Sequence, residues 1–142
     1  MGGEAQKILA EREVLYPKIT EAIPEVIGAW RGLQRAVLRD GALPVKTKEL
    51  IALGMGIVRQ CKYCITNHTQ ACLDAGATRE EICEVFGVAL LMGGGPAGAY
   101  SRFALGVLDE LLAGGDGARA LRGAGAGEGC ADGFCGAEAA AR

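Results

Sequence analysis

Apolar residues recur every three or four positions through most of this chain, which is the period of an α-helix. The stretch that follows Pro24 shows it clearly, because Val26, Trp30, Leu33 and Val37 fall on one helical face. No segment alternates apolar and polar residues in the way that a half-buried β-strand does. The pattern therefore predicts an all-α fold.

Pro, Gly and capping residues divide this pattern into about six predicted helices. Pro17 is expected to stop the first helix, and Gly76 suits the residue that follows the end of the fourth. Thr78 and Glu81 form a capping box that predicts the start of the fifth. The predicted helices cover about 4–16, 24–39, 46–59, 61–75, 79–92 and 96–112.

The composition changes after Ala113. Residues 114–142 are dominated by Gly and Ala, and such a segment cannot bury enough apolar surface to order itself. We therefore expect one helical domain over residues 1–113 and a flexible tail over 114–142. The tail contains Cys130 and Cys135, which we interpret as incidental thiols, with electron transfer to the core or metal binding as alternatives.

Charge and hydropathy exclude several classes of partner. The chain has 15 basic and 17 acidic residues, well mixed along its length, so nothing in its charge favours nucleic acid or an anionic membrane. No apolar run reaches the ~18–20 residues of a transmembrane helix, and the N-terminus lacks the apolar core of a signal peptide. We therefore expect a cytoplasmic protein. Its six cysteines are then expected to be catalytic, metal-binding or buried rather than a disulfide framework.

Cys61, Cys64 and His68 form the chemically distinctive motif, and His68 is the only histidine of the chain. On a helix these positions follow i, i+3, i+7, so all three side chains share one face. Backbone N–H groups and the dipole at a helix start favour a thiolate, and a second thiol three residues away can close a disulfide. His68 can take or give a proton near neutral pH.

Two other interpretations of the motif stay open at this point. Cys-x2-Cys followed by His is a zinc-like ligand set, although its fourth ligand would have to be Cys72, Cys83 or a carboxylate. Alternatively the cysteines are small buried hydrophobic residues. The spacing favours redox-active thiols over both. The aliphatic neighbours of Cys72 and Cys83 favour a core role for these two, although Cys72 lies eight residues after Cys64 on roughly the same face and could be near the site. Glu49 joins the motif if the chain bends tightly near Gln60 and folds the preceding helix back, so that Glu49 points at the dithiol.

Glu49, Cys61, Cys64 and His68, with their spacing, resemble the signature of the alkylhydroperoxidase D-like branch of the carboxymuconolactone decarboxylase family. Residues 48–53, 75–82 and 90–96 also look like this family, and the resemblance covers about residues 20 to 112. It implies an all-α fold with a helical hairpin core, assembled into a homo-trimer or homo-hexamer.

The resemblance also implies roles for the four residues. Cys64 would be the nucleophile that attacks a hydroperoxide, Cys61 would resolve it as a Cys61–Cys64 disulfide, and Glu49 and His68 would form a proton relay. Members of the branch carry a second histidine immediately before the second cysteine, where this chain has Tyr63. The expected enzyme is a peroxidase that needs a thiol or dithiol electron donor and neither a cofactor nor a metal.

Two alternatives belong to other functional classes. One is a cofactor-free decarboxylase-type enzyme that uses His68 and Glu49 as acid and base on a lactone. The other is a binding module in which the motif holds zinc or a structural disulfide. The cysteine pair favours the peroxidase over both.

Overall fold

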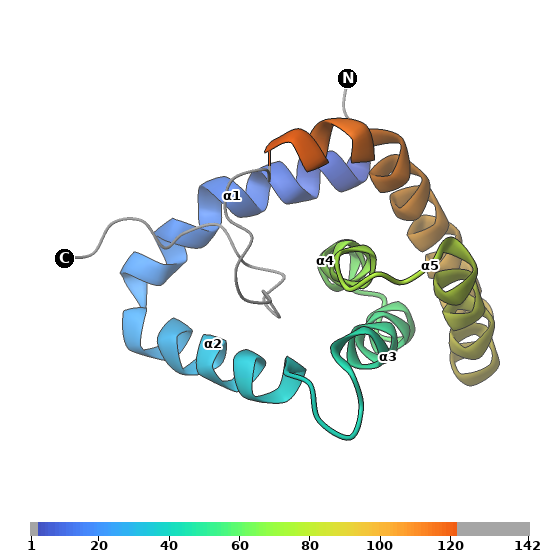
Figure 1. Cartoon of the computed structure of the whole chain (residues 1–142), viewed down its shortest axis with the longest axis horizontal. Helices are drawn as coiled ribbons and strands as arrows, with labels where there is room; N and C mark the ends of the chain where they lie inside the picture. The colour runs from blue at the N-terminus through green and yellow to red at the C-terminus, as the bar shows by residue number, and fades with distance from the viewer. Residues whose placement is uncertain (1–2, 122–142) are drawn as a thin grey trace.

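The computed structural model describes residues 3–121, and it describes side chains for residues 3–114. The described residues form helices and no strands, as the periodicity predicts. Figure 1 shows α3, α4 and α5 gathered into one bundle, with α1 and α2 extending from it to one side. The helices are α1 (Glu4–Ala22), α2 (Pro24–Leu38), α3 (Val45–Val58), α4 (Lys62–Asp74) and α5 (Arg79–Leu121).

Local sequence signals explain most of these boundaries. Pro24 is the first residue of α2, where its missing N–H costs nothing. Gly76 has a φ of 81° after the end of α4, a conformation that glycine adopts without strain. The capping box is formed: the backbone N–H of Glu81 donates to Thr78 Oγ1 at 3.2 Å, and the N–H of Thr78 donates to Glu81 Oε2 at 2.9 Å.

The prediction that Pro17 ends the first helix is wrong, because α1 continues through it to Ala22. Proline inside a helix costs about 3 kcal/mol, but contacts made by neighbouring residues can offset that cost. Arg31 of α2 donates from Nε to the Tyr16 hydroxyl at 3.1 Å and stacks over its ring at 4.8 Å. Thr20 donates to the Tyr16 carbonyl at 2.8 Å. These contacts hold the last turn of α1 in place.

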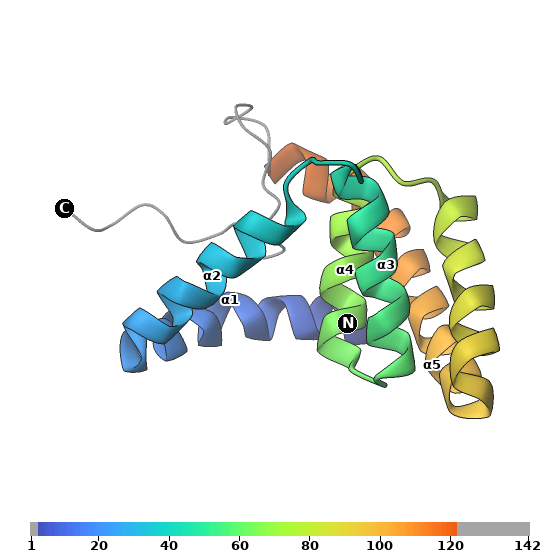
Figure 2. The ribbon, with the colours of Figure 1, turned by 90° about the horizontal axis from the view of Figure 1, so that it is seen from below.

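The predicted turn between the fifth and sixth helices is confirmed, although the two helices are labelled together as α5. Gly94, with φ 64° and ψ −153°, breaks α5 into a first arm (79–93) and a second arm (95–121). The arms fold back on each other as a helical hairpin (Figure 2). Arg79 Nη1 lies 2.5 Å from Asp109 Oδ1, which ties the start of the first arm to the second.

Measured by length and composition alone, one helix in the described part of the chain could cross a membrane, namely 79–114. The break at Gly94 falls inside this segment. The first arm alone is shorter than the ~20 residues of a helical span, and the second arm carries Arg102, Asp109 and Glu110.

The core lies among α3, α4 and α5. It consists mainly of aliphatic and small residues, which agrees with an aromatic content of only 5%. The N-terminal turn of α1 joins this body, because the Ala5 N–H donates to Glu110 Oε2 at 3.0 Å and both Ala5 and Ile8 are buried. The buried core residues include Leu53, Ile57, Ile65, Cys72, Ile82, Ala89, Ala97, Ala104 and Leu108.

The predicted tail lies mostly outside the described residues, including Cys130 and Cys135. The division of the chain near residue 113 therefore stays a prediction.

Candidate functional site

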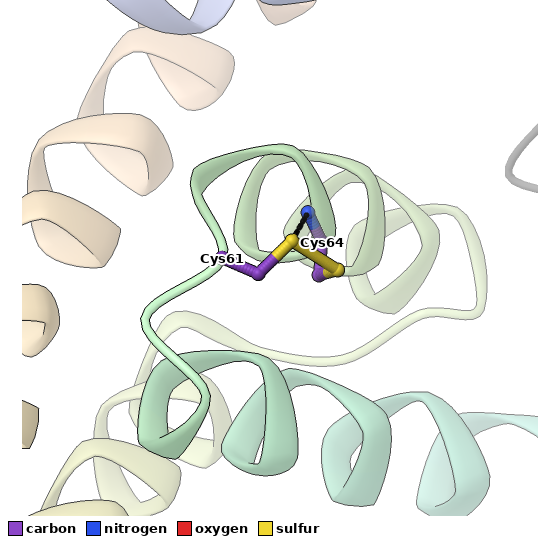
Figure 3. Close-up of a disulfide and its surroundings, with 2 residues drawn as sticks. All are labelled: Cys61 and Cys64. Atoms are coloured by element: carbon purple, nitrogen blue, oxygen red, sulfur yellow. Dashed lines mark hydrogen bonds between the residues drawn. A yellow bond between two sulfur atoms is a disulfide. The ribbon is translucent and has the colours of Figure 1, made fainter.

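Cys61 and Cys64 form a disulfide at the start of α4 (Figure 3). Their Cα atoms are 5.2 Å apart, and Cys61 is the N-cap residue of the helix. The backbone N–H of Cys64 donates to Cys61 Sγ at 3.2 Å. The sequence prediction that the pair lies at a helix start, close enough to bridge, is therefore confirmed. Both residues are partly exposed, so reagents in solution can reach the bond.

The link between α3 and α4 sets the position of Cys61. Gln60 has a φ of 59°, which is uncommon for a residue other than glycine. The N–H of Gln60 donates to the Ile57 carbonyl at 3.0 Å, and the N–H of Cys61 donates to the Gly56 carbonyl at 3.0 Å. This is the tight bend that the sequence prediction required near Gln60, and it turns α4 back along α3.

Gly56 allows α3 and α4 to approach closely behind the disulfide. It is buried, and a Cβ placed there would lie 3.2 Å from Cys64 Cβ and 3.5 Å from the backbone nitrogen of Ile65. Any larger side chain would therefore press on the helix that carries Cys64. Sequence analysis missed this residue, because a glycine inside a helical pattern does not show which neighbour it faces.

Glu49 and His68 meet on the adjoining part of the same interface. Glu49 Oε2 lies 2.7 Å from His68 Nδ1, and Glu49 is only 1% exposed. Burying a carboxyl group without a hydrogen-bond partner costs free energy, so the contact with His68 offsets the cost of burying Glu49. When Glu49 is ionised, Nδ1–H donates to it and Nε2 is left as the basic nitrogen.

The structure thus brings all four predicted residues to the α3–α4 interface, although not quite as expected. Glu49 contacts His68, the pairing that the family resemblance implies, whereas the bend near Gln60 by itself suggested a contact with the dithiol. Among the described residues, neither Glu49 nor His68 hydrogen-bonds to Cys61 or Cys64, and His68 lies one turn beyond Cys64 on α4. The arrangement holds a disulfide and an acid–base pair at one helix–helix interface, with Cys64 and His68 both on α4 and Glu49 on α3.

Cys72 belongs to the core, as the sequence favoured. It is fully buried, and burial together with the negative charge of Glu49 raises the pKa of its thiol to about 12. Cys72 therefore stays protonated and unreactive near neutral pH. Cys83 is partly buried and packs against the same core.

Helix α1 contributes polar contacts along α4 beside the disulfide. Tyr63 donates from its hydroxyl to Glu11 Oε1 at 3.2 Å, and this hydrogen bond is the main reason that the pKa of Tyr63 is raised. Lys62 Nζ lies 2.6 Å from Glu4 Oε1. These pairs are far apart in sequence, and no sequence signal identifies them. Tyr63, at the position of the branch's second histidine, is bound to α1 and is 53% exposed.

Within residues 3–114, no three His, Cys, Asp or Glu side chains converge in a way that could hold a metal ion. Neither Cys72 nor Cys83 joins the motif as a fourth ligand there. The zinc interpretation therefore finds no ligand set among the described side chains.

Comparison with known proteins identifies relatives over most of the chain. Residues 24–109 match the carboxymuconolactone decarboxylase family. An uncharacterized protein of Cupriavidus necator is 36% identical over 105 residues, which span 74% of this chain and 93% of the relative.

Solved structures show the same fold. One is the apo form of a carboxymuconolactone decarboxylase family protein from Legionella pneumophila, with a TM-score of 0.73 and 37% identity over 75% of this chain and 96% of the other. Another is a family protein from Thermotoga maritima for which an involvement in antioxidative response has been suggested. Its TM-score is 0.70, with 35% identity over 79% of this chain and 95% of the other.

Proposed function

The chain belongs to the carboxymuconolactone decarboxylase family, and from this premise we propose that it is a thiol-dependent peroxidase of the alkylhydroperoxidase D-like branch. The observation that carries the proposal is the Cys61–Cys64 disulfide beside the Glu49–His68 pair on the α3–α4 interface. The antioxidative response suggested for the Thermotoga maritima relative points in the same direction.

The proposed reaction begins with the reduced dithiol. Cys64 thiolate attacks the peroxide oxygen, the O–O bond breaks, and an alcohol leaves with a proton supplied from His68. Cys61 thiolate then attacks the Cys64 sulfur of the sulfenic acid, which forms the disulfide, and the displaced hydroxide takes up one of the two protons that the thiols released and leaves as water. One hydroperoxide and two thiols thus become one alcohol, one water and one disulfide, so atoms and electrons balance.

A thiol or dithiol donor completes the cycle. Its thiolate attacks Cys64, and Cys61 leaves as a thiolate. A second donor thiolate then attacks the donor sulfur of this mixed disulfide, so that Cys64 leaves as a thiolate and the donor leaves as a disulfide. The Cys64 N–H that donates to Cys61 Sγ stabilises the departing Cys61 thiolate, as does the start of α4. Glu49 holds the His68 ring through Nδ1 and leaves Nε2 to exchange protons on the side of the helix that carries Cys64.

The test is turnover of tert-butyl hydroperoxide with dithiothreitol as donor. Cys64→Ser should abolish turnover. Cys61→Ser, treated with the hydroperoxide before any donor is added, should react once per chain and stop at a Cys64 sulfenic acid, which dimedone traps, or at a mixed disulfide once a monothiol is added. Cys83→Ser is the matched control, because this thiol lies outside the site, and it should keep full activity. An active Cys64→Ser variant would exclude the proposed mechanism.

The acid–base pair is tested separately. His68→Ala should slow turnover by ~10²–10⁴-fold, and Glu49→Gln should slow it less, because Glu49 acts by holding the imidazole. Both losses should be non-additive in the double variant. Full activity in His68→Ala would remove the relay.

A second candidate function follows from the same Glu49–His68 pair, which is an acid–base device with or without the thiols. It is cofactor-free decarboxylation of a lactone. Carboxymuconolactone turnover that persists when both Cys61 and Cys64 are replaced by serine would favour this reaction over peroxide reduction.

A further inference from the structure

Asn67 of α4 carries hydrogen-bond donors beside Cys64 that the proposed reaction leaves unused. With ~3.6 residues per turn, Asn67 lies about 60° around the helix from Cys64 on one side, and His68 lies about 40° from it on the other. Side chains three or four positions apart on a helix are neighbours, with Cβ atoms ~5–6 Å apart. The amide and the imidazole therefore flank the sulfur that attacks the peroxide in this reaction.

Helix α1 fixes which way the Asn67 amide points. Arg12 of α1 donates from Nη1 to Asn67 Oδ1 at 3.1 Å. A guanidinium has donors and no acceptor, so only the amide oxygen can face it, and the NH2 group lies on the other branch of the amide. The Arg12 side chain is only 19% exposed, and it also donates from Nη2 to Glu13 Oε1 at 3.0 Å. A cation held in place thus orients the amide.

The NH2 group of Asn67 is available to a ligand. Within the described part of the chain, Nδ2 has no hydrogen-bond partner, whereas the other side-chain amide of α4, Gln70, donates to Asp74 at 3.0 Å. Asn67 and Cys64 are both partly exposed, so a small molecule that reaches the sulfur can also reach this group. An oriented donor beside a reacting atom can stabilise negative charge that develops there, and it needs no reorganisation during the reaction.

We propose that Asn67 Nδ2 donates a hydrogen bond to the leaving oxygen of the hydroperoxide, and that Arg12 is the positioning residue that orients it. This inference rests on the proposed peroxidase reaction and adds a catalytic residue to it. Cys64 thiolate bonds to the terminal oxygen, the O–O bond breaks, and the electron pair of that bond moves to the second oxygen. Asn67 stabilises the charge on this oxygen until the proton from His68 reaches it, and transfers no proton itself.

Such a hydrogen bond matters most when the leaving group is poor. An alkoxide concentrates its negative charge on one oxygen, whereas the carboxylate that leaves from a peroxy acid spreads its charge over two oxygens. Only an interaction that is stronger in the transition state accelerates the chemical step. Asn67 is therefore expected to favour alkyl hydroperoxides as a substrate class, and to contribute little to the reaction with peroxy acids.

Single-turnover oxidation of the reduced protein, freed of donor, tests the proposal. Loss of the Cys61 and Cys64 thiols is timed at one pH with tert-butyl hydroperoxide and with peracetic acid, and the rate with the first is divided by the rate with the second. Asn67→Ala should lower this ratio by ~10²-fold, because removing one oxyanion donor costs ~10²–10³-fold and Cys64 is partly open to water. A purely structural role of Asn67 would slow both oxidants equally and leave the ratio unchanged.

Two further variants separate hydrogen-bond donation from the contact with α1. Asn67→Asp keeps an oxygen for Arg12 but has no NH2 group, so it should lower the ratio as Asn67→Ala does. Arg12→Ala keeps the NH2 group but lets the amide turn, so it should lower the ratio by less. In the Asn67→Ala background, Arg12→Ala should lower it no further, because Arg12 acts through Asn67.

Gln70→Ala is the matched control. It removes the other amide of α4, which lies about 120° around the helix from Cys64, and it should keep the wild-type ratio. Circular dichroism checks that each variant keeps its helices. If Asn67→Ala does not fold, Asn67→Asp gives the measurement, because it retains the contact with Arg12.

The outcomes separate this inference from the function on which it rests. A wild-type protein that tert-butyl hydroperoxide does not oxidise would remove the peroxidase function and this inference together. With an active wild type, an unchanged ratio in Asn67→Ala or Asn67→Asp would overturn the role of Asn67 alone. A larger loss in Arg12→Ala than in Asn67→Ala, or an equal loss in Gln70→Ala, would also overturn it.

Discussion

Replacing Gly56 by alanine tests whether close packing of α3 on α4 positions the redox site. The new Cβ would lie 3.2 Å from Cys64 Cβ, tighter than ordinary van der Waals contact. Such overpacking typically costs ~1–3 kcal/mol, whereas alanine gains about 1 kcal/mol of helix propensity over glycine. The expected net effect is a loss of up to about 2 kcal/mol in the free energy of unfolding.

Gly106→Ala is the matched control for that substitution. Gly106 also lies inside a helix, but a Cβ there meets nothing within 4 Å, so only the gain in propensity applies. Gly106→Ala should therefore be more stable than Gly56→Ala by about 1–3 kcal/mol. Urea unfolding at equal protein concentration measures the difference. Because strain at Gly56 pushes on α4, only Gly56→Ala should also change the reduction potential of Cys61–Cys64 in thiol buffers. Equal stability and equal potential in the two variants would refute the reasoning.

Three further predictions concern groups whose environment the structure defines. Cys72, with a pKa raised to about 12, should resist iodoacetamide at pH 9 in the folded protein and react in urea. The pKa of Cys72 is higher in the folded than in the unfolded protein. The free energy of unfolding should therefore be unaffected by this thiol below pH ~9 and should fall as pH rises from there toward the folded pKa. Thr78→Ala should remove the helix cap and lower the free energy of unfolding by about 1 kcal/mol, measured by urea unfolding. The pKa of Glu81 is lowered, mainly by the hydrogen bond from Lys46, so Glu81→Gln should destabilise the protein near neutral pH and the difference from wild type should shrink as pH falls through the lowered value.

The parts of the fold that follow from short-range interactions were predictable. Pro24, Gly76 and the Thr78–Glu81 capping box act within one turn of their own helix end, so the sequence placed those boundaries correctly. The bridging distance of Cys61 and Cys64 is equally local, because i, i+3 geometry at a helix start brings the two sulfurs together.

Features that depend on distant residues were predicted only in part. The sequence by itself suggested that Glu49 belonged with the motif and pointed at the dithiol, whereas the structure pairs it with His68. Pro17 was misjudged because the residues that stabilise the helix around it include Arg31, which belongs to another helix. The break between the last two predicted helices is at Gly94, as the sequence indicated, but the fold of the two arms back on each other depends on how the arms of α5 pack.

The sequence by itself determined that this chain is helical, where most helices begin and end, and that Cys64 and His68 share one face of α4 with Cys61 at its start, since each of these follows from interactions within a few residues. The tertiary structure decided which faces meet. It buried Glu49 against His68, placed Gly56 behind Cys64, and left every residue of α2 at least partly exposed. These outcomes depend on how helices far apart in the chain pack together, and the order of the residues along each helix does not specify that packing.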